Sequence, residues 1–420
     1  MSVLNLKKRK KIMIIPAWYP SETNPVHGIF IKEQAKASSL YNEVLILYVY
    51  PNPNTDVNKL YQSSESIEDG MRTIRVKYRS STKYFKKITS QISKENYESN
   101  NNAPNTRNFN IINKICNYLD VLIYYWGNFK AFRKLLKQGW KPDIINAHVF
   151  TAGVPAIILG KIYRIPVLIS EHYSGFIKKD LRNIDKCKAK FSMNNASAIL
   201  PVSKGLKVSI QNYKIKNKFY IIPNTYDKKI FYPTKIRIKK EKIKMLLVAN
   251  ITPIKGIDYL LKSINYLKLK RNDFQLDIVG DGPSKEEYET MAMDLGLGEI
   301  VNFHGQKTNA EVAIYMRNCD FFVQPSLFET FGVVYIEAMG CGKPIIGTKT
   351  VGPLEIINEN VGILIPPKNV NSLVDALNFM LDNYENYSSE DISKFACKNF
   401  SYEPVGKQLN EVYLEFVKEL

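Results

Sequence analysis

The sequence has little of what marks several common protein classes. Its five cysteines are widely scattered, include no Cys-x-x-Cys pair and are odd in number. This argues against a disulfide framework or a zinc site and indicates a reducing cytoplasm. Four histidines without metal-ligand spacing, and no obvious carboxylate cluster such as Asp-x-Asp, predict no protein-held metal. No apolar run approaches the ~18–20 residues of a membrane span, and the longest candidate, 149–160, is too short. We therefore expect a cytoplasmic protein that does not cross a bilayer.

Charge is unevenly balanced, because 59 Lys and Arg face 40 Asp and Glu, which gives a net charge of +19. A surplus of this size predicts attraction to nucleic acid, anionic lipid or phosphorylated substrates. The alternative is a lysine-rich composition without functional meaning. No nucleic-acid-binding motif is present and the basic residues are spread along the chain, so we expect no nucleic-acid partner. Salt-dependent retention on DNA would instead favour a nucleic-acid-binding function.

The first half alternates strands and helices around one polar stretch. Residues 51–110 are predicted to be irregular, and 80–108 to form a mobile basic insertion, since they are rich in Ser, Asn and Lys. The following helix, 111–138, is rich in Tyr, Trp and Phe. The other predicted strands are 12–15, 43–50, 143–148, 166–170, 198–203 and 219–223, and the other helices 29–40, 151–163, 184–195 and 204–213.

A charged segment at 228–243, which contains Pro233, is the expected linker to a second series of elements. Two of its helices begin with the Ser/Thr-x-x-Glu pattern of a capping box, at Ser284 and at Thr308. The predicted strands are 244–250, 274–280, 301–305, 319–325, 344–348 and 361–365, and further helices begin near 257, 332, 370 and 402.

Strands that alternate with helices predict parallel sheets with right-handed crossovers. We therefore predict an α/β protein of two facing, doubly wound, Rossmann-like domains with a cleft between them. The expected domains are 1–235 and 236–401, with a terminal helix, 402–420, packing back toward the first. In open α/β sheets ligands bind beyond the carboxyl ends of the strands, so the cleft is the expected site.

The densest motif is QPSLFETFGVVYIEAMGCGKPIIGT, at 324–348. A buried strand ends, a loop carries Glu329, Thr330, Phe331 and Gly332, and a helix follows at once. Free amides and the helix dipole at such an N-terminus favour an anion, and Gly332 lets a phosphate approach the backbone. Glu337, inside the helix, can accept two hydrogen bonds from a vicinal diol such as a ribose.

Two other turns follow predicted strands of the same domain. Lys255 and Gly256 lie where a strand gives way to a helix, and a lysine at that position is favourable if an anion lies between it and the helix. Gly280 opens the turn GDGP, which would also suit an ordinary tight turn.

Together these motifs resemble glycosyltransferase family 4, retaining enzymes of the GT-B fold. The resemblance rests on Glu329-x7-Glu337, VQPS, AMGCGKPII, IKG at 254–256, GDGP, FHG at 303–305 and IIPNTYD at 221–227. The opening AWYPSETNPVHGIFIKEQA and the series DIINAH…PVLISEH are similar to members that build bacterial cell-surface polysaccharides. The match touches nearly the whole chain outside 51–140.

The resemblance implies transfer of a sugar from a nucleotide diphosphate to an acceptor hydroxyl, with retention, no metal and no cofactor. By this analogy Glu337 holds the ribose, Lys255 neutralises the diphosphate, and the amides of Phe331 and Gly332 bind the distal phosphate. Glu329, Lys255 and His148 take part in catalysis, with Glu171 and His172 as weaker candidates. The remaining implied donor-site residues are Gly28, Asn250, Gly256, Gly280, His304, Gly305 and Thr330.

One departure concerns Asn250, which stands where the family often has an arginine on the diphosphate. The loss of one charge-assisted hydrogen bond costs about 1.5–3 kcal/mol, unless Asn250 donates a neutral bond or another basic residue substitutes. A nucleotide-sugar epimerase on the same fold is an alternative that product analysis would distinguish.

The acceptor is expected to be a glycan or a lipid-linked saccharide. The basic 80–94 segment and the aromatic helix at 111–138 suit peripheral binding to an anionic inner-leaflet membrane surface. The alternative is that these aromatic residues pack the core of the first domain.

Overall fold

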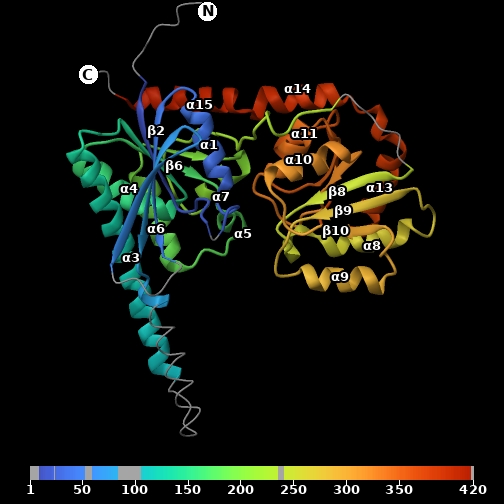
Figure 1. The fold of residues 1–420 in the computed structure, drawn as a ribbon, viewed down its shortest axis with the longest axis horizontal. Helices are drawn as coiled ribbons and strands as arrows, with labels where there is room; N and C mark the ends of the chain where they lie inside the picture. Colours follow the sequence, from blue (N-terminus) through green and yellow to red (C-terminus); the bar gives the residue numbers. More distant parts are fainter. Residues whose placement is uncertain (1–8, 23, 53–58, 84–105, 235–240, 418–420) are drawn as a thin grey trace, which may run out of the picture.

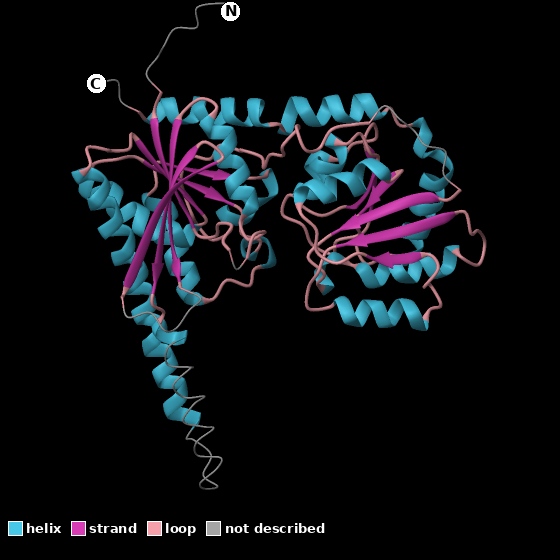
Figure 2. Cartoon of the chain, in the orientation of Figure 1, coloured by secondary structure: helices cyan, strands magenta, loops and turns pink. Residues whose placement is uncertain are grey.

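The computed structural model describes residues 9–22, 24–52, 59–83, 106–234 and 241–417, with side chains from Ile112 onward in the helix that begins at 106. Two sheets, each flanked by helices, lie side by side (Figure 1 and Figure 2). The first is built from residues 11–201 and the second from residues 243–365. The chain thus consists of two Rossmann-like α/β units.

Over the described residues, the first sheet has seven strands in the order β3-β4-β2-β1-β5-β6-β7, and all neighbours are parallel except β3 and β4. Two adjacent central strands, β1 and β2, contain continuous runs of buried apolar residues, at 12–15 and 44–50, as expected for a parallel sheet covered on both faces. The strands are β1 Lys11–Pro16, β2 Glu43–Pro51, β3 Tyr61–Glu68, β4 Met71–Tyr78, β5 Ile144–His148, β6 Val167–Glu171 and β7 Ala198–Pro201. The helices are α1 Ile29–Ser39, α3 Thr106–Lys137, α4 Phe150–Tyr163, α5 Gly175–Lys178, α6 Asn183–Asn195 and α7 Lys204–Gln211.

The second sheet has six parallel strands in the order β10-β9-β8-β11-β12-β13. The strands are β8 Ile243–Val248, β9 Phe274–Val279, β10 Val301–Phe303, β11 Phe321–Val323, β12 Ile345–Thr348 and β13 Gly362–Ile365. The helices are η1 Pro253–Lys255, α8 Ile257–Leu267, α9 Lys285–Asp294, α10 Asn309–Asn318, α11 Val333–Gly340, α12 Pro353–Ile356, α13 Val370–Asn383, η2 Tyr384–Asn386, α14 Ser389–Phe400 and α15 Tyr402–Phe416.

Helices α14 and α15 run along one side of the molecule and cross from the second unit to the first (Figure 1). Helix α15 packs on α1 so closely that a Cβ on Gly406 would lie 2.1 Å from the carbonyl oxygen of Ala37. Asn146 in β5 donates a hydrogen bond of 2.8 Å to the buried Tyr413 hydroxyl. Helix α15 is therefore part of the first unit's core.

Several predictions about secondary structure were wrong. Residues 51–110 are not uniformly irregular, because they contain the antiparallel pair β3–β4. Strand β3 is an edge strand with exposed side chains, so its composition resembles a loop. The predicted strand 219–223 makes a single bridge, between Phe219 and Ile199. Ser284 begins α9 without a side-chain cap, whereas Thr308 and Glu311 form the predicted capping box on α10.

Two expectations concern segments that lie partly outside the described ranges. The proposed mobile insertion at 80–108 coincides mostly with 84–105, and the proposed linker at 228–243 contains 235–240. Helix α14 was not predicted, although Ser388 accepts a hydrogen bond from the Asp391 amide at its start, with an N···O distance of 3.2 Å.

Candidate active site

Three turns meet at the carboxyl edge of the second sheet, after β8, β9 and β11. Gly280 has φ 138°, and a Cβ there would lie 1.8 Å from the carbonyl oxygen of Ala249. The turns are tied together by the Ile251 amide, which donates to the carbonyl of Asp281 over 2.8 Å. Asn250 is exposed at this edge, and its side-chain oxygen would lie 2.9 Å from a Cβ on Gly282. These glycines allow two backbone turns to touch.

Lys255 and Glu329 form an ion pair at this edge, with 2.8 Å between Nζ and Oε2. Both side chains are mostly buried. Gly256, with φ 68°, begins α8, and a Cβ there would lie 2.2 Å from the carbonyl oxygen of Pro325. The Leu327 amide donates to the carbonyl of Ile254 over 2.8 Å. The lysine at the start of α8 thus has an anionic partner within the chain, and the two predicted turns form one site.

Helix α11 begins directly after this ion pair. Gly332 is its N-cap residue in the left-handed region, with φ 88°. Thr330 and Phe331 are buried, and the Gly352 amide fixes the loop by donating to the carbonyl of Glu329 over 3.1 Å. Within the described ranges, the amides of Phe331 and Gly332 donate no hydrogen bond. Free amides at a helix N-terminus are suited to an anion.

Glu337 lies on α11, one turn beyond this N-terminus, and is half-buried. Burial, with a smaller contribution from the Glu33 carboxyl in α1, raises the pKa of Glu337 to about 8. Glu33 belongs to the first unit, so this interaction crosses the boundary between the two units. Near neutral pH the group is mostly protonated, and a ligand that donates hydrogen bonds to Glu337 would favour its ionised form.

His304 and Gly305 follow β10, where the next strand of the sheet ends. The His304 ring contacts the Asp277 carboxylate, with 2.8 Å between Nε2 and Oδ1, and lies 4.8 Å from the Tyr315 ring centre. The Gly305 carbonyl accepts from the Gly280 amide over 2.9 Å. These two residues are therefore joined to the Gly280 turn.

The site residues predicted on the first sheet come together around His148, the last residue of β5. His148 is buried, and its Nδ1 lies 3.1 Å from Nε2 of His172, which follows β6. Within the described part of the chain, Nε2 of His148 has no hydrogen-bond partner. Phe30, two residues after the N-cap Gly28 of α1, packs on the His172 ring with 4.7 Å between centroids.

Burial keeps both histidines neutral. The pKa of His148 is lowered well below its usual value by burial and by His172, and burial lowers the pKa of His172 to about 3. This pair can therefore donate or accept hydrogen bonds at neutral pH but does not provide positive charge.

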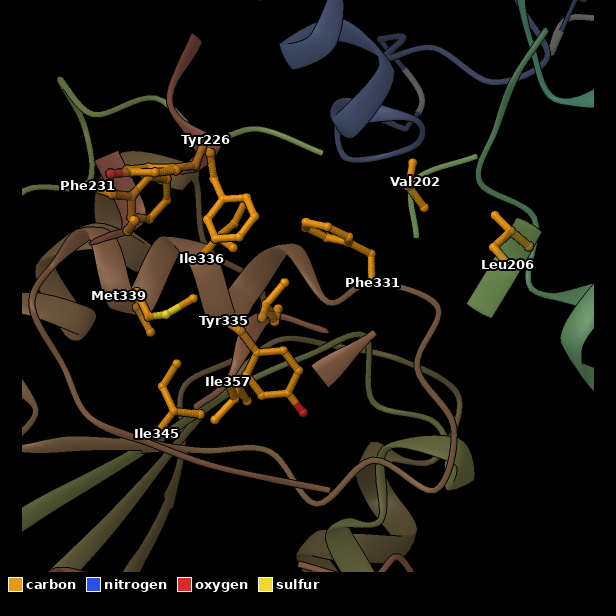
Figure 3. Close-up of a cluster of buried hydrophobic side chains, with 14 of the residues drawn as sticks. Val202, Leu206, Tyr226, Phe231, Phe331, Tyr335, Ile336, Met339, Ile345 and Ile357 are labelled. Carbon is orange, nitrogen blue, oxygen red and sulfur yellow. The ribbon is translucent and has the colours of Figure 1, made fainter. Parts of the chain in front are cut away.

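The two edges meet through Ser203, which follows β7, and Thr330. The Ser203 hydroxyl donates to the carbonyl of Thr330 over 3.2 Å. Figure 3 shows Phe331 between α11 and the pair Val202 and Leu206 of the first unit, and all three belong to one buried cluster. The loop before α11 is thus held by both units.

Sequence reasoning missed the residues that make this connection. Glu355 of α12 accepts hydrogen bonds from the amides of Lys204 and Gly205 at the start of α7, each 2.8 Å long. Lys178 of α5 places its ammonium 5.5 Å from the Phe328 ring centre. No local pattern marks such residues, because each contact joins segments more than 100 positions apart.

Among the described residues, no group of three or more His, Cys, Asp or Glu side chains is arranged to hold a metal ion. Over the same ranges, no helix combines the length and apolarity that crossing a membrane would require.

Two Rossmann-like units that meet at the carboxyl edges of their sheets define the GT-B class of fold. The family described as glycosyl transferases group 1 matches residues 228–398, and the family described as Glycosyltransferase Family 4 matches residues 97–229. Together these matches span most of the chain. The chain belongs to the family 4 glycosyltransferases, and it is an enzyme of that class.

Individual proteins agree with this assignment. An uncharacterised glycosyltransferase of Methanocaldococcus jannaschii is 29% identical over 315 residues, which cover 71% of this chain and 86% of that protein. Sucrose-phosphate synthase of Thermosynechococcus elongatus has a similar fold, with a TM-score of 0.73, 20% identity and coverage of 97% and 99% of the two chains. Anabaena HepE, solved in complex with UDP, has a TM-score of 0.68 at 18% identity, over 97% of this chain and all of that one.

Proposed function

We propose that this enzyme is a retaining, metal-independent transferase. Its donor would be a nucleotide-diphosphate sugar, and its acceptor a hydroxyl of a glycan or lipid-linked saccharide in cell-surface polysaccharide synthesis. The observation that supports the donor site best is the Lys255–Glu329 pair, 2.8 Å long, beside the free amides at the start of α11. A cation and two amides directed at one place suit a diphosphate that gains charge as it leaves.

In this proposal Lys255 and the amides of Phe331 and Gly332 bind the diphosphate, and Glu337 accepts hydrogen bonds from the ribose. Glu329 and His148 position the transferred sugar from the two sides. The bond between the anomeric carbon and the phosphate oxygen breaks while the acceptor oxygen bonds to that carbon on the same face. The acceptor proton passes to the leaving phosphate, so no protein nucleophile, metal or cofactor is required. Gly28 would approach the diphosphate from the first unit.

Thermal-shift screening with UDP, GDP and their sugars tests the donor, because a ligand of the folded state raises the melting temperature. UDP is the first choice, since HepE was solved in complex with it. Release of nucleoside diphosphate then measures turnover, and NMR of the product gives the anomeric configuration. Inversion, dependence on a divalent metal, or release of an altered free sugar would contradict the proposal.

We further propose that the acceptor side contacts an anionic inner-leaflet membrane. Helix α3 projects from the first unit (Figure 1), with Tyr118, Leu122 and Trp126 exposed on it, although Phe132 is buried in the core. An apolar groove of about 310 Å³ lies between α3 and α4. Lys130, Arg133 and Lys134 line the adjacent pocket. Apolar side chains beside lysines and arginines suit an anionic lipid surface.

Flotation with vesicles tests this surface. We expect salt-sensitive binding to phosphatidylglycerol vesicles and little binding to phosphatidylcholine. The substitution Leu122→Asp should weaken binding, whereas Phe379→Asp, at an exposed position on α13 of the second unit, should leave it unchanged. Equal binding by both variants would reject this location for the membrane contact.

A further inference from the structure

Glu171, the last residue of β6, is fully buried and belongs to no described ion pair. Its Oε2 accepts a hydrogen bond from the Phe150 amide over 3.0 Å. Its Oε1 accepts from the amides of His172 and Tyr173 over 2.9 and 2.8 Å. One carboxylate thus joins two backbone segments that follow neighbouring strands. The Tyr173 side chain interacts electrostatically with this carboxylate, and His172 follows Glu171 directly in the chain.

The segment after β5 has a backbone that needs such support. Val149 has φ 73° and ψ 139°, a backbone conformation that a β-branched residue rarely adopts. Holding this conformation requires a free energy comparable to that of one hydrogen bond. The Val149 amide donates to the carbonyl of Ser170 over 2.8 Å, and the Ala17 amide donates to the carbonyl of His148 over 3.1 Å. Together with the Phe150 bond, these contacts determine the direction in which the chain leaves His148.

The Glu171 carboxylate also determines the position of His172, because it accepts a hydrogen bond from the His172 backbone amide. The two imidazole rings are nearly parallel, at 11° with 5.3 Å between centroids. His148 Nδ1 and His172 Nε2 are 3.1 Å apart. This contact orients the Nε2 of His148, which has no hydrogen-bond partner among the described residues. A change at Glu171 would alter both segments and therefore the geometry of the ring pair.

We propose that Glu171 is a positioning residue, whose carboxylate holds the His148–His172 pair in register by binding the backbone amides next to both rings. The kinetic part of this inference rests on the proposed function of His148. The structural part does not, because it concerns the ring geometry alone.

The substitution Glu171→Gln tests the positioning role, because the glutamine side chain has nearly the same shape as glutamate. The amide side chain keeps one accepting oxygen but turns an NH2 group toward backbone N–H donors, so one segment loses its acceptor. We expect kcat to fall about tenfold or more, the cost of one charge-assisted bond. The donor KM should stay within about twofold, because the proposed diphosphate and ribose contacts lie on the second sheet. Glu171→Asp, which keeps the charge but has a shorter reach, should fall between wild type and Gln.

The matched control is Asp143→Asn. Asp143 immediately precedes β5, and its carboxylate accepts the Lys11 amide over 2.7 Å at the opposite end of the strand from His148. The two substitutions therefore make the same carboxylate-to-amide change beside the two ends of one strand, but only Glu171 uses both of its oxygens as acceptors. Asp143→Asn should keep the wild-type kcat.

A second measurement does not depend on activity. The chain has four histidines, so selective ¹⁵N-histidine labelling gives a simple spectrum of the ring nitrogens. We expect Glu171→Gln to change the ring signals of His148 and His172 and to leave those of His27 and His304 in place. Asp143→Asn should change none of them.

Unchanged ring signals and kcat in Glu171→Gln would overturn the proposal, and so would an equal loss of kcat in Asp143→Asn. If Glu171→Gln does not fold, Glu171→Asp decides by the same two measurements. If the wild-type enzyme transfers no sugar, the proposed function fails, whereas the ring signals still determine whether Glu171 positions the pair.

Discussion

The carboxyl edges of the two sheets carry different chemistry. The second sheet presents an ion pair between Lys255 and Glu329 with glycine turns around it. Beside it lie the amides of Phe331 and Gly332, which donate no hydrogen bond to any described residue. The first sheet presents two buried histidines, whose pKa values are lowered by burial. One edge is therefore suited to a charged group, and the other to neutral hydrogen bonding in a water-poor environment.

In the proposed function, this difference corresponds to separate tasks for the two units. A diphosphate requires positive charge and exposed amides, which the second edge provides. A sugar or acceptor hydroxyl is recognised by directional, uncharged hydrogen bonds, because an unpaired charge beside it would be costly to bury. Substitutions on the second edge should therefore mainly affect donor affinity and leaving-group departure, whereas those on the first should mainly affect kcat.

Removing the cation should have the largest effect. We expect Lys255→Ala to lower kcat/KM about 10²–10³-fold, the range for removing one preorganised charge-stabilising group. It also leaves Glu329, which is mostly buried, without its partner. Steady-state release of nucleoside diphosphate measures this loss.

The control for Lys255→Ala is Lys262→Ala. Lys262 lies on the same helix, α8, in an exposed pair with Asp258, which is worth little. Its variant should keep kcat/KM within about twofold. Similar losses in both variants would mean that general surface charge, and not the pair at the edge, attracts the donor.

The glycine that begins α11 should have the next largest effect. Gly332 has φ 88°, and a Cβ there would lie 2.4 Å from the Tyr335 ring. Gly332→Ala must shift the loop and its amides, so we expect donor affinity to fall about 10–100-fold, the equivalent of one charge-assisted bond. Isothermal titration with the nucleoside diphosphate measures it.

Gly298→Ala provides the comparison, because a Cβ at Gly298 would have no atom of the described residues within 4 Å. Its donor affinity should match that of wild type. If Gly332→Ala binds the diphosphate normally, the free amides of this loop are not the anion site.

The pH dependence of donor binding tests Glu337. With a pKa of about 8, this carboxyl is mostly protonated at pH 7 and mostly ionised at pH 9. Because ribose hydroxyls would donate to the ionised form, donor affinity should rise about tenfold over this interval. Titrations at several pH values measure this rise, and Glu337→Gln should abolish it.

Stability should change in the opposite direction. A carboxyl whose folded pKa lies above its unfolded value, about 4.3, binds more protons in the folded state between those two values. Its contribution to the free energy of unfolding is therefore lost as pH rises toward 8. Burial also raises the pKa of Glu171, to about 7, so this group likewise lowers the free energy of unfolding as pH rises. The contribution of Glu337 is therefore the difference in stability between wild type and Glu337→Gln. A pH-independent affinity in wild type would contradict the role of Glu337.

The residues that meet at the carboxyl edge of the second sheet could be predicted from the sequence, and those at the edge of the first sheet only in part. The parallel strands β8 and β11 contain continuous apolar runs, at 245–248 and 321–323. The turns that follow these strands carry Lys255, Gly256, Glu329 and Gly332. The sequence predicted that these turns converge, and the structure brings Lys255 and Glu329 into contact.

The remaining features depend on contacts that leave no local pattern. Glu171 acts through three backbone amides, which any residue types could supply, so nothing in the sequence identifies its partners. The β3–β4 pair was missed because an exposed edge strand has no apolar alternation. Its turn, Asp69–Gly70, has φ 48° and 77°, and Asp-Gly is a common hairpin signal that could have revealed it.

The smallest predicted effect concerns α9 and α10, two helices of the second unit whose sequences both begin with the Ser/Thr-x-x-Glu pattern of a capping box. The Thr308 hydroxyl is bonded to Glu311 in a complete capping box on α10, whereas Ser284 has φ −103° and makes no side-chain cap on α9. Thr308→Ala should therefore lower the free energy of unfolding by about 1 kcal/mol, and Ser284→Ala by much less, as measured by urea denaturation. Equal losses would mean that Ser284 caps α9 in solution. Because α9 directly follows the Gly280 turn, that turn would then be held by one hydrogen bond more than the structure contains.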